Sequence, residues 1–119
     1  MITIISHGFK FSRPEANFVM DVSFFKNPWR DEEIKNEKDE FKRKQLIMKF
    51  MKDQEGLELF VDRVSSLLRL LYLIHPNENM VVAFCCSAGE YRSPAIAEMV
   101  GEVLGSDVAK VIKGDNSKI

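Results

Sequence analysis

One apolar run constrains the fold of this chain more than any other feature of its sequence. Residues 80–86, MVVAFCC, are all apolar. Such a run is too short for most helices, and it is rich in residues that favour strands. Because it has no polar position to face solvent, the strand that it forms must be covered on both faces, as strands of parallel sheets are. It therefore predicts an inner strand of a small, mostly parallel sheet, and with it an α/β domain.

Three shorter segments predict further strands. Residues 1–6, 18–22 and 108–112 are short apolar runs with β-branched residues, bounded by polar or turn-forming positions. The chain has 119 residues, of which 45% are hydrophobic, so a single core can form without disulfide or metal staples. No repeat, low-complexity segment or linker divides the sequence. We therefore expect residues 1–119 to form one domain.

Two stretches predict helices on either side of the inner strand. From 56 to 75, apolar side chains recur at the spacing of one helix face, and Pro76 stops the pattern. Ser93 followed by Pro94 is typical of an N-cap and a first helical position, and it predicts a second helix over 95–104. The face of the first helix that we expect to be buried holds Leu57, Phe60, Val61, Val64, Leu67, Leu68, Leu71 and Ile74. This alternation of strands and helices predicts a central sheet flanked by helices.

Residues 30–55 differ in character from the rest of the chain. Between Arg30 and Asp53, 15 of 24 residues are charged, 7 of them acidic and 8 basic, with the two signs interspersed. This pattern predicts a solvated, partly helical insert. A nucleic-acid-binding arm built on residues 42–44, Lys-Arg-Lys, is the alternative, although acidic residues stand beside that cluster.

The charge balance and the cysteines limit the setting in which the protein works. Lys and Arg number 17 against 18 Asp and Glu, which argues against nucleic-acid binding by bulk positive charge. No apolar run approaches the roughly 20 residues that a membrane span needs, so we expect no membrane association. The only two cysteines, Cys85 and Cys86, are neighbours and are poorly placed for an ordinary disulfide. A reducing cytoplasm is the simplest setting.

The chemically informative segment follows the inner strand. Residues 86–93, CSAGEYRS, have the form Cys, five residues, Arg, Ser, and they lead into a helix start. A loop that curls into a helix N-terminus aims backbone N–H groups at one point, where the helix dipole adds about half a positive charge. Gly89 relaxes the backbone, and Arg92 adds a planar fork suited to two phosphate oxygens. Cys86 faces the same positive end, which favours its thiolate. The segment predicts an oxyanion site; the alternative is an ordinary helix start with Cys86 in the core.

These eight residues resemble the phosphate loop of cysteine-dependent protein phosphatases. The resemblance implies that Cys86 attacks phosphorus, that Arg92 holds the equatorial oxygens, and that Ser93 assists departure of the thiolate. Such a mechanism also needs a carboxylic acid to protonate the departing oxygen. Asp21 and Asp31 are the candidates upstream of the loop.

A second resemblance covers nearly the whole chain. Residues 6–10, Ser-His-Gly-Phe-Lys, followed by Pro14, Ala16, residues 19–24 and Asn27-Pro28, are similar to the opening of the C-terminal domain of the RapZ family, whose members are known as RNase adapters. Residues 82–93 and 96–98 resemble the same domain in the same order. The resemblance implies a small α/β domain that binds a phosphorylated metabolite, an amino-sugar phosphate in studied members. It also implies RNA binding, partner contact and oligomerisation. Family members carry an N-terminal nucleotide-binding domain as well, and its P-loop motif does not occur in this sequence.

The RapZ resemblance places particular residues around the ligand. It puts the backbone and side chains of the loop around the phosphate and brings Lys10 and Asp21 toward it. The candidate ligand-binding residues are therefore Lys10, Asp21, Cys86, Ser87, Ala88, Gly89, Glu90, Tyr91, Arg92 and Ser93. We predict a sensor or adapter module for a sugar phosphate or nucleotide-like ligand rather than a catalyst. The alternative is a phosphatase with Cys86 as its nucleophile and Asp21 as its acid.

The sequence contains no pattern typical of a metal site or of a cofactor-binding site. His7 and His75 stand apart, with no Cys or Asp at metal-ligand spacing, so we expect no metal site. No cofactor motif is present. The expected partners are a phosphorylated small molecule, a second copy of the chain, and RNA or an RNase.

Overall fold

The computed structural model describes residues 1–119 and contains one four-stranded sheet. Its strands are β1 (Ile2–Gly8), β2 (Phe18–Asp21), β3 (Met80–Cys86) and β4 (Ala109–Ile112). Their spatial order is β2-β3-β1-β4, and all neighbouring pairs are parallel. The α/β fold is thus confirmed, and the apolar run 80–86 is one of the two inner strands. The sheet is entirely parallel.

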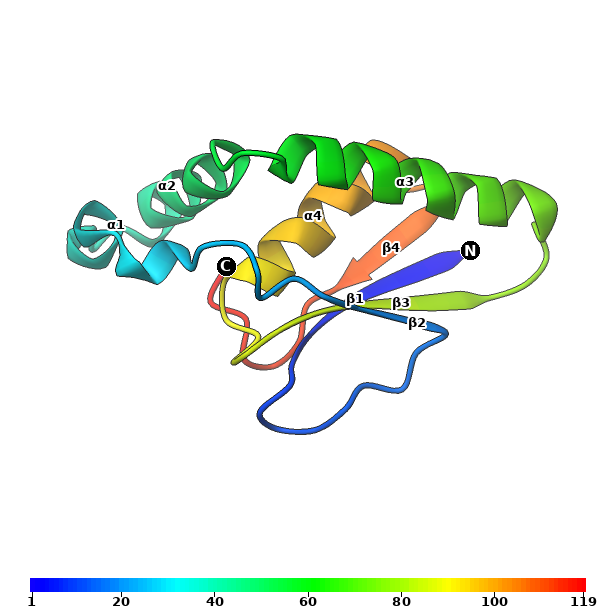
Figure 1. Ribbon diagram of the computed structural model, residues 1–119, viewed down its shortest axis with the longest axis horizontal. Helices are drawn as coiled ribbons and strands as arrows, with labels where there is room; N and C mark the ends of the chain where they lie inside the picture. Colours follow the sequence, from blue (N-terminus) through cyan, green and yellow to red (C-terminus); the bar gives the residue numbers. More distant parts are fainter.

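The helices lie over one face of this sheet and beyond its carboxyl end (Figure 1). A 3-10 turn η1 (Pro28–Arg30), α1 (Glu32–Asn36) and α2 (Glu40–Lys52) follow β2. Next come α3 (Leu57–Ile74) and, after β3, α4 (Arg92–Leu104). On the opposite face Figure 1 shows only the 9–17 loop, which connects β1 to β2. No helix has both the length and the apolar character needed to cross a membrane.

Strand β1 shows which face of the sheet carries the core. Its buried and half-buried residues alternate along the strand, as they must when only one face is covered by helices. Ile2 and Ile4 point into the core, where they meet Val82 and Phe84 of β3. Ile5 and His7 lie on the opposite, open face and are half-buried. The sequence of β3 is apolar at every position because even on the open face Ala83 and Cys85 are fully buried between their neighbours.

Helix α3 confirms the predicted helical spacing but buries a narrower stripe than its sequence suggested. Leu57, Val61, Val64 and Leu68 are at most 8% exposed and pack in the core. Leu67 and Ile74 were expected on this face, but they are 46% and 57% exposed. The reason is geometric: the helix has a single sheet face and α4 to pack against, so only residues close to one line along it are covered.

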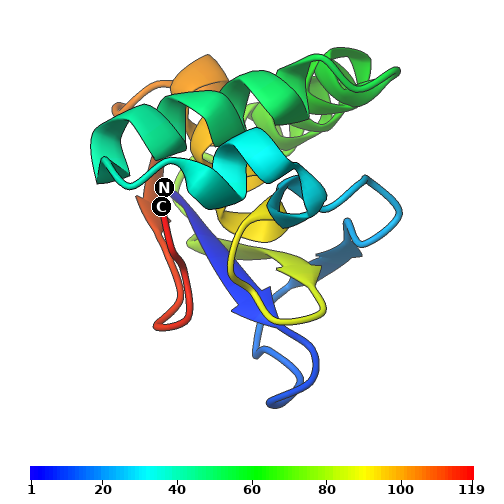
Figure 2. The ribbon, with the colours of Figure 1, turned by 90° about the vertical axis from the view of Figure 1, so that its left-hand side faces the viewer.

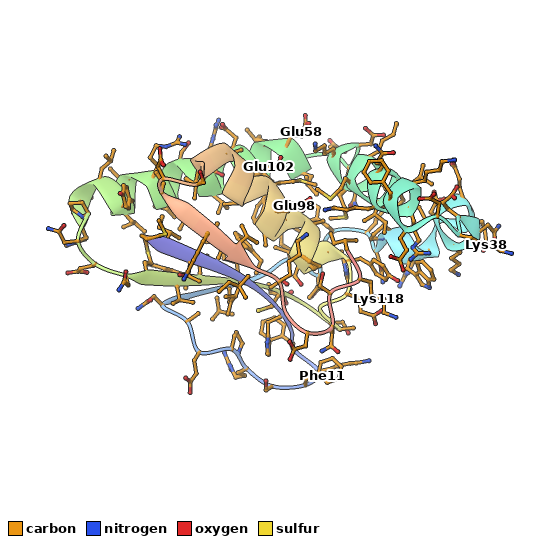
Figure 3. All side chains as sticks on the ribbon, turned by 180° about the vertical axis from the view of Figure 1, so that it is seen from behind. Phe11, Lys38, Glu58, Glu98, Glu102 and Lys118 are labelled. Carbon is orange, nitrogen blue, oxygen red and sulfur yellow. The ribbon has the colours of Figure 1, made fainter.

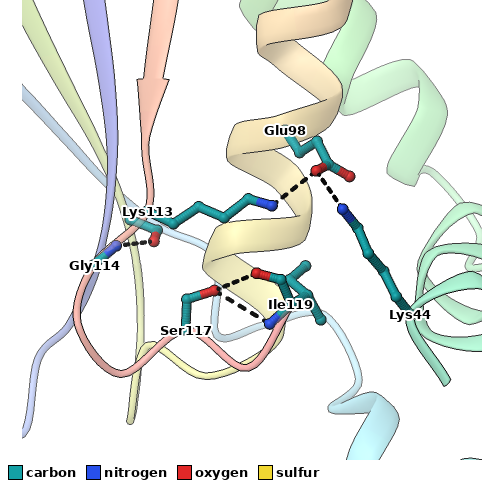
Figure 4. A network of polar contacts seen from close by, with 7 residues as sticks. Lys44, Glu98, Lys113, Gly114, Ser117 and Ile119 are labelled. Carbon is teal, nitrogen blue, oxygen red and sulfur yellow. Dashed lines mark hydrogen bonds and ion pairs between the residues drawn. The ribbon is translucent and has the colours of Figure 1, made fainter. Parts of the chain in front are cut away.

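A shared carboxylate ties α2, α4 and the C-terminal tail together (Figure 4). Glu98 Oε1 on α4 accepts hydrogen bonds from Lys44 Nζ of α2 at 2.9 Å and from Lys113 Nζ after β4 at 2.8 Å. Partial burial works to raise the pKa of Glu98, but the hydrogen bonds from the two lysines outweigh it and bring the pKa below its ordinary value. Glu98 therefore stabilises the docking of the charged 30–55 segment on the domain.

Replacing Glu98 by glutamine tests this connection. The carboxylate stabilises the fold fully above about pH 5, and its contribution is lost as pH falls through the lowered pKa. We expect E98Q to be less stable than the wild type by about 1 kcal/mol at neutral pH, and the difference to vanish in acid. Urea unfolding at a series of pH values measures it. Glu102→Gln, one turn along α4 at an exposed position (Figure 3), is the control, and equal losses for the two variants would contradict the prediction.

Candidate functional site

The β3–α4 loop, residues 87–91, lies where two neighbouring strands send the chain to opposite sides of the sheet. After β3 the chain enters α4 on the helix-covered face, whereas after β1 it enters the 9–17 loop on the open face (Figure 1). Figure 2 looks onto the carboxyl ends of the strands and shows this loop in front of β1 and β3. In open parallel sheets such a switch point is where ligands bind, because the departing connections leave a crevice between them.

The backbone of this loop has donors without acceptors. None of the N–H groups from Ser87 to Ser93 donates a hydrogen bond to any group in the chain. The carbonyls nearby are satisfied: Cys86 O accepts from Phe9 N at 2.9 Å, and Ser87 O accepts from Lys10 N at 3.0 Å. The loop is thus held through its carbonyls, while its amides stay available at the N-terminus of α4. Unpaired N–H groups at a helix N-terminus are the kind of donors that bind anions in proteins.

Two glycines allow the end of β1 to lie directly against the loop. Gly89 has a φ of 72°, and a Cβ there would meet Gly8 N at 2.7 Å. A Cβ on Gly8 would meet the carbonyl carbon of Ala88 at 2.5 Å. Gly89 was predicted to relax the loop, but Gly8 was not among the predicted site residues. Its sequence signals are its place just after the first predicted strand and its membership in residues 6–10, which carry part of the RapZ resemblance.

Cys86 and Ser93 meet beneath the loop. The Cys86 Sγ donates to Ser93 Oγ at 3.3 Å, and Ser93 Oγ lies 3.4 Å from the carbonyl oxygen of His7, to which it donates. Both side chains are buried. The prediction that Ser93 is the N-cap is wrong. The helix begins at Arg92, two residues before the predicted first helical position, Pro94, and Tyr91 occupies the cap without a side-chain hydrogen bond. Ser93 is drawn inward because His7 O at the end of β1 offers it a buried acceptor.

Arg92 turns toward the segment that follows β2. Its Nη1 donates to Ser23 O at 2.7 Å and to Phe25 O at 3.2 Å, and the residue is half-buried. Asp21 lies in the same corner, where its carboxylate accepts from the Ser23 hydroxyl and from Ser23 N. These hydrogen bonds, with the Arg92 charge in addition, hold the pKa of Asp21 below its ordinary value. Asp21 and Arg92, far apart in sequence, are thus brought together.

The other cysteine has a different environment. Cys85 faces the open side of the sheet, in register with His7 on β1 and Asp21 on β2. Burial, together with the neighbouring Cys86 and Asp21, raises the pKa of its thiol to about 11. A thiol with so high a pKa is a poor nucleophile at neutral pH. Of the two adjacent cysteines, only Cys86 adjoins the loop and the start of α4.

Comparison with known proteins identifies the family. The model of the RapZ C-terminal domain matches residues 1–115. The chain belongs to the RapZ C-terminal domain family. A nucleotide-binding protein of Caldicellulosiruptor saccharolyticus is 32% identical over 126 residues, covering 96% of this chain and 43% of that protein. A nucleotide-binding protein of Salinispora arenicola is 32% identical over 111 residues, covering 90% of this chain and 37% of the relative. The chain therefore spans less than half the length of these relatives.

Other predicted site residues of this RapZ C-terminal domain serve as supports in the structure. Lys10 contacts the loop through its backbone, while its Nζ lies 5.3 Å from the ring centroid of Phe11, at the tip of the 9–17 loop (Figure 3). Tyr91 stacks on Trp29 with ring centroids 5.2 Å apart, and burial raises the pKa of its phenol. Glu90 Oε2 lies 3.6 Å from Lys118 Nζ. Their roles in ligand binding stay predictions.

The need for glycine at position 89 can be measured. Gly89→Ala adds both the strain of a positive φ, about 1–2 kcal/mol, and a clash with the backbone of Gly8. Gly56→Ala is a matched control, since Gly56 has a φ of 81° but nothing within 4 Å of its added Cβ. We expect urea unfolding to show a clearly larger loss of stability for Gly89→Ala. Equal losses would show that the close approach of β1 to the loop does not constrain this position.

Proposed function

We propose that this domain binds a small phosphorylated molecule at the β3–α4 loop and acts as a sensor or adapter module. The observation that carries the proposal is the run of backbone N–H groups from Ser87 to Ser93 that have no acceptor in the chain. They stand at the N-terminus of the 13-residue helix α4, whose dipole favours negative charge there. A phosphoryl group offers several oxygens to such converging donors.

Arg92 supplies the matching charge. A guanidinium has five N–H donors in a fixed plane, and here Nη1 serves the carbonyls of Ser23 and Phe25. This anchoring restricts the side chain before any ligand arrives, so less conformational entropy is lost when its remaining donors bind an anion. The segment after β2 therefore takes part in the site by holding Arg92.

The names of the relatives agree with a phosphorylated ligand but do not identify it. They are called nucleotide-binding proteins, and the present chain covers less than half of each one described above. The ligand class therefore rests on the phosphoryl group that the loop would bind. A binding experiment has to identify the sugar or nucleoside attached to it.

The surroundings of Asp21 support binding rather than turnover. A general acid must carry a proton at the working pH, whereas the hydrogen bonds from Ser23 favour the ionised form of Asp21. The other candidate acid, Asp31, caps α1 by accepting from Glu33 N at 2.9 Å.

Contact with RNA through residues 42–44 is a weaker proposal. Lys44 pairs with Glu98, and Arg43 Nη1 donates to Glu37 O at 3.1 Å. Two of the three basic side chains are thus engaged within the domain, which leaves little free positive charge for a phosphate backbone.

Arg92→Ala tests the binding site. Isothermal titration with inorganic phosphate, a panel of sugar phosphates and mononucleotides should reveal at least one ligand of the wild type. We expect the variant to bind that ligand at least tenfold more weakly, because a hydrogen-bonded charge is lost. Arg63→Ala, at an exposed position on α3, is the control. Unchanged affinity in Arg92→Ala, or no phosphorylated ligand for the wild type, would contradict the proposal.

The 3.3 Å contact between Cys86 Sγ and Ser93 Oγ is the one observation that favours a phosphatase. Incubation with an aryl phosphate separates the two functions. We expect no turnover by the wild type, and Cys86→Ser should keep its affinity for phosphate because the loop amides and Arg92 remain. Turnover that disappears in Cys86→Ser would instead make the domain a cysteine-dependent phosphatase.

A further inference from the structure

The single tryptophan of the chain lies against the end of the β3–α4 loop. Trp29 belongs to η1, and its ring stacks on that of Tyr91 with centroids 5.2 Å apart and planes 6° from parallel. Parallel, offset rings at this separation are a favoured aromatic pair. Tyr91 is 7% exposed and stands directly before Arg92, the first residue of α4. The stack therefore acts at the point where the loop becomes the helix.

Tyr91 is also part of the small core of the charged 30–55 segment. Ile34 of α1 and Ile47 of α2 are buried, and Tyr91 is the third buried member of their cluster. The half-buried side chains packed around this cluster are Trp29, Leu46, Phe50 and Ile119. The segment that the sequence indicated as a solvated insert thus packs its apolar side chains around a residue of the β3–α4 loop.

Trp29 is held in a fixed turn. The side chain of Asn27 accepts a hydrogen bond from Trp29 N at 3.0 Å. Pro28, which is buried, begins the turn, and its ring restricts the backbone φ. Asp31 N donates to Pro28 O at 3.0 Å and closes the turn. The indole ring is therefore carried by a well-connected backbone.

The same stretch of chain holds Arg92. The two carbonyls that accept from its guanidinium belong to Ser23 and Phe25, which precede Trp29 by six and four residues. Tyr91 and Arg92 are consecutive, and both contact residues 23–29, the first by a ring stack and the second by two hydrogen bonds. This stretch therefore contacts the end of the loop at two adjacent residues.

The end of the loop near Tyr91 has few other attachments. Tyr91 stands at the cap of α4 without a side-chain hydrogen bond. Its carbonyl accepts from Ala95 N at 3.1 Å, and the carbonyl of Glu90 accepts from Lys118 N at 2.9 Å. The beginning of the loop, in contrast, is tied to the backbone after β1 by two hydrogen bonds. Packing of the Tyr91 ring therefore decides how firmly the second end is held.

We propose that Trp29 is a positioning residue for the anion site: by stacking on Tyr91 it fixes the end of the β3–α4 loop, and with it the loop amides and the start of the Arg92 side chain. The effect on affinity rests on the proposed function. A loop already held in its binding conformation loses less conformational entropy when the ligand arrives, so removal of the stack weakens binding. Trp29 acts in this way without touching the ligand.

Backbone ¹⁵N relaxation of the protein without ligand tests the positioning. Order parameters are about 0.85 for rigid backbone and below about 0.6 for flexible backbone. We expect the amides of residues 87–93 to be rigid in the wild type and to move toward the flexible value in Trp29→Ala. Trp29→Phe keeps a ring and should stay close to the wild type. Tyr91→Leu should loosen the same amides, whereas Tyr91→Phe should not.

Leu104→Ala is the control for a general loss of stability. Leu104 is 5% exposed at the far end of α4, about 18 Å from Arg92 at the helical rise per residue. This variant should lower the melting temperature and leave the order parameters of residues 87–93 unchanged. Loop amides that stay rigid when the stack is removed, or that loosen equally in Leu104→Ala, overturn the proposal.

Titration with inorganic phosphate tests the consequence for binding. We expect Trp29→Ala and Tyr91→Leu each to weaken binding about fivefold, the size expected of one aromatic pair. The double variant W29A/Y91L should bind no more weakly than either single variant, because both changes break the same stack. Losses that multiply in the double variant overturn the action of Trp29 through Tyr91. A wild type that binds neither phosphate nor any phosphorylated ligand contradicts the proposed function, and the order parameters decide the positioning role in either case.

Discussion

The direct contact between the end of β1 and the β3–α4 loop is the constraint on which the rest of the site depends. The backbone after β1 donates from Phe9 N and Lys10 N to the loop carbonyls, and Gly8 lies against Gly89 with no room for a side chain between them. These contacts engage the carbonyls of Cys86 and Ser87 and leave the loop N–H groups free of partners in the chain. The amides can then remain without partners inside the chain while the loop keeps a defined shape.

The one-sided cover of the sheet explains where the chemistry and the surfaces lie. Every helix lies on one face of the sheet or beyond its carboxyl end. The β3–α4 loop therefore turns toward the helices, whereas the connection after β1 turns toward the open face (Figure 2). The same one-sidedness leaves the outer side of α3 without a neighbour.

Electrostatics link parts of the chain that are distant in sequence. Arg92 fastens the segment after β2 by two carbonyls, and Asp21 in the same corner is kept ionised by Ser23. Glu98, further along α4, connects this helix to α2 and to the C-terminal tail, because Lys44 and Lys113 both donate to its carboxylate. Arg92 and Glu98 thus connect the first two turns of α4 to the segment after β2, to α2 and to the C-terminal tail.

The sequence by itself determined the elements and the place of the candidate site. An apolar run of strand length favours an inner strand of a parallel sheet, and a Cys, five residues, Arg, Ser segment before a helix start favours an anion at that helix end. Resemblance to the RapZ C-terminal domain could also be found from sequence order, and the family match confirms it. These features are local, so they can be recognised without knowing which distant residues they meet.

Only the tertiary structure decided how the pieces meet. The close approach of Gly8 to Gly89, the inward turn of Ser93 and the anchoring of Arg92 on Ser23 O all join residues that are far apart in the sequence. The exposure of Leu67 depends likewise on how much of α3 the sheet and α4 can cover. Periodicity gives the direction in which a side chain points from its helix, but whether another element stands there is set by the packing of the whole chain.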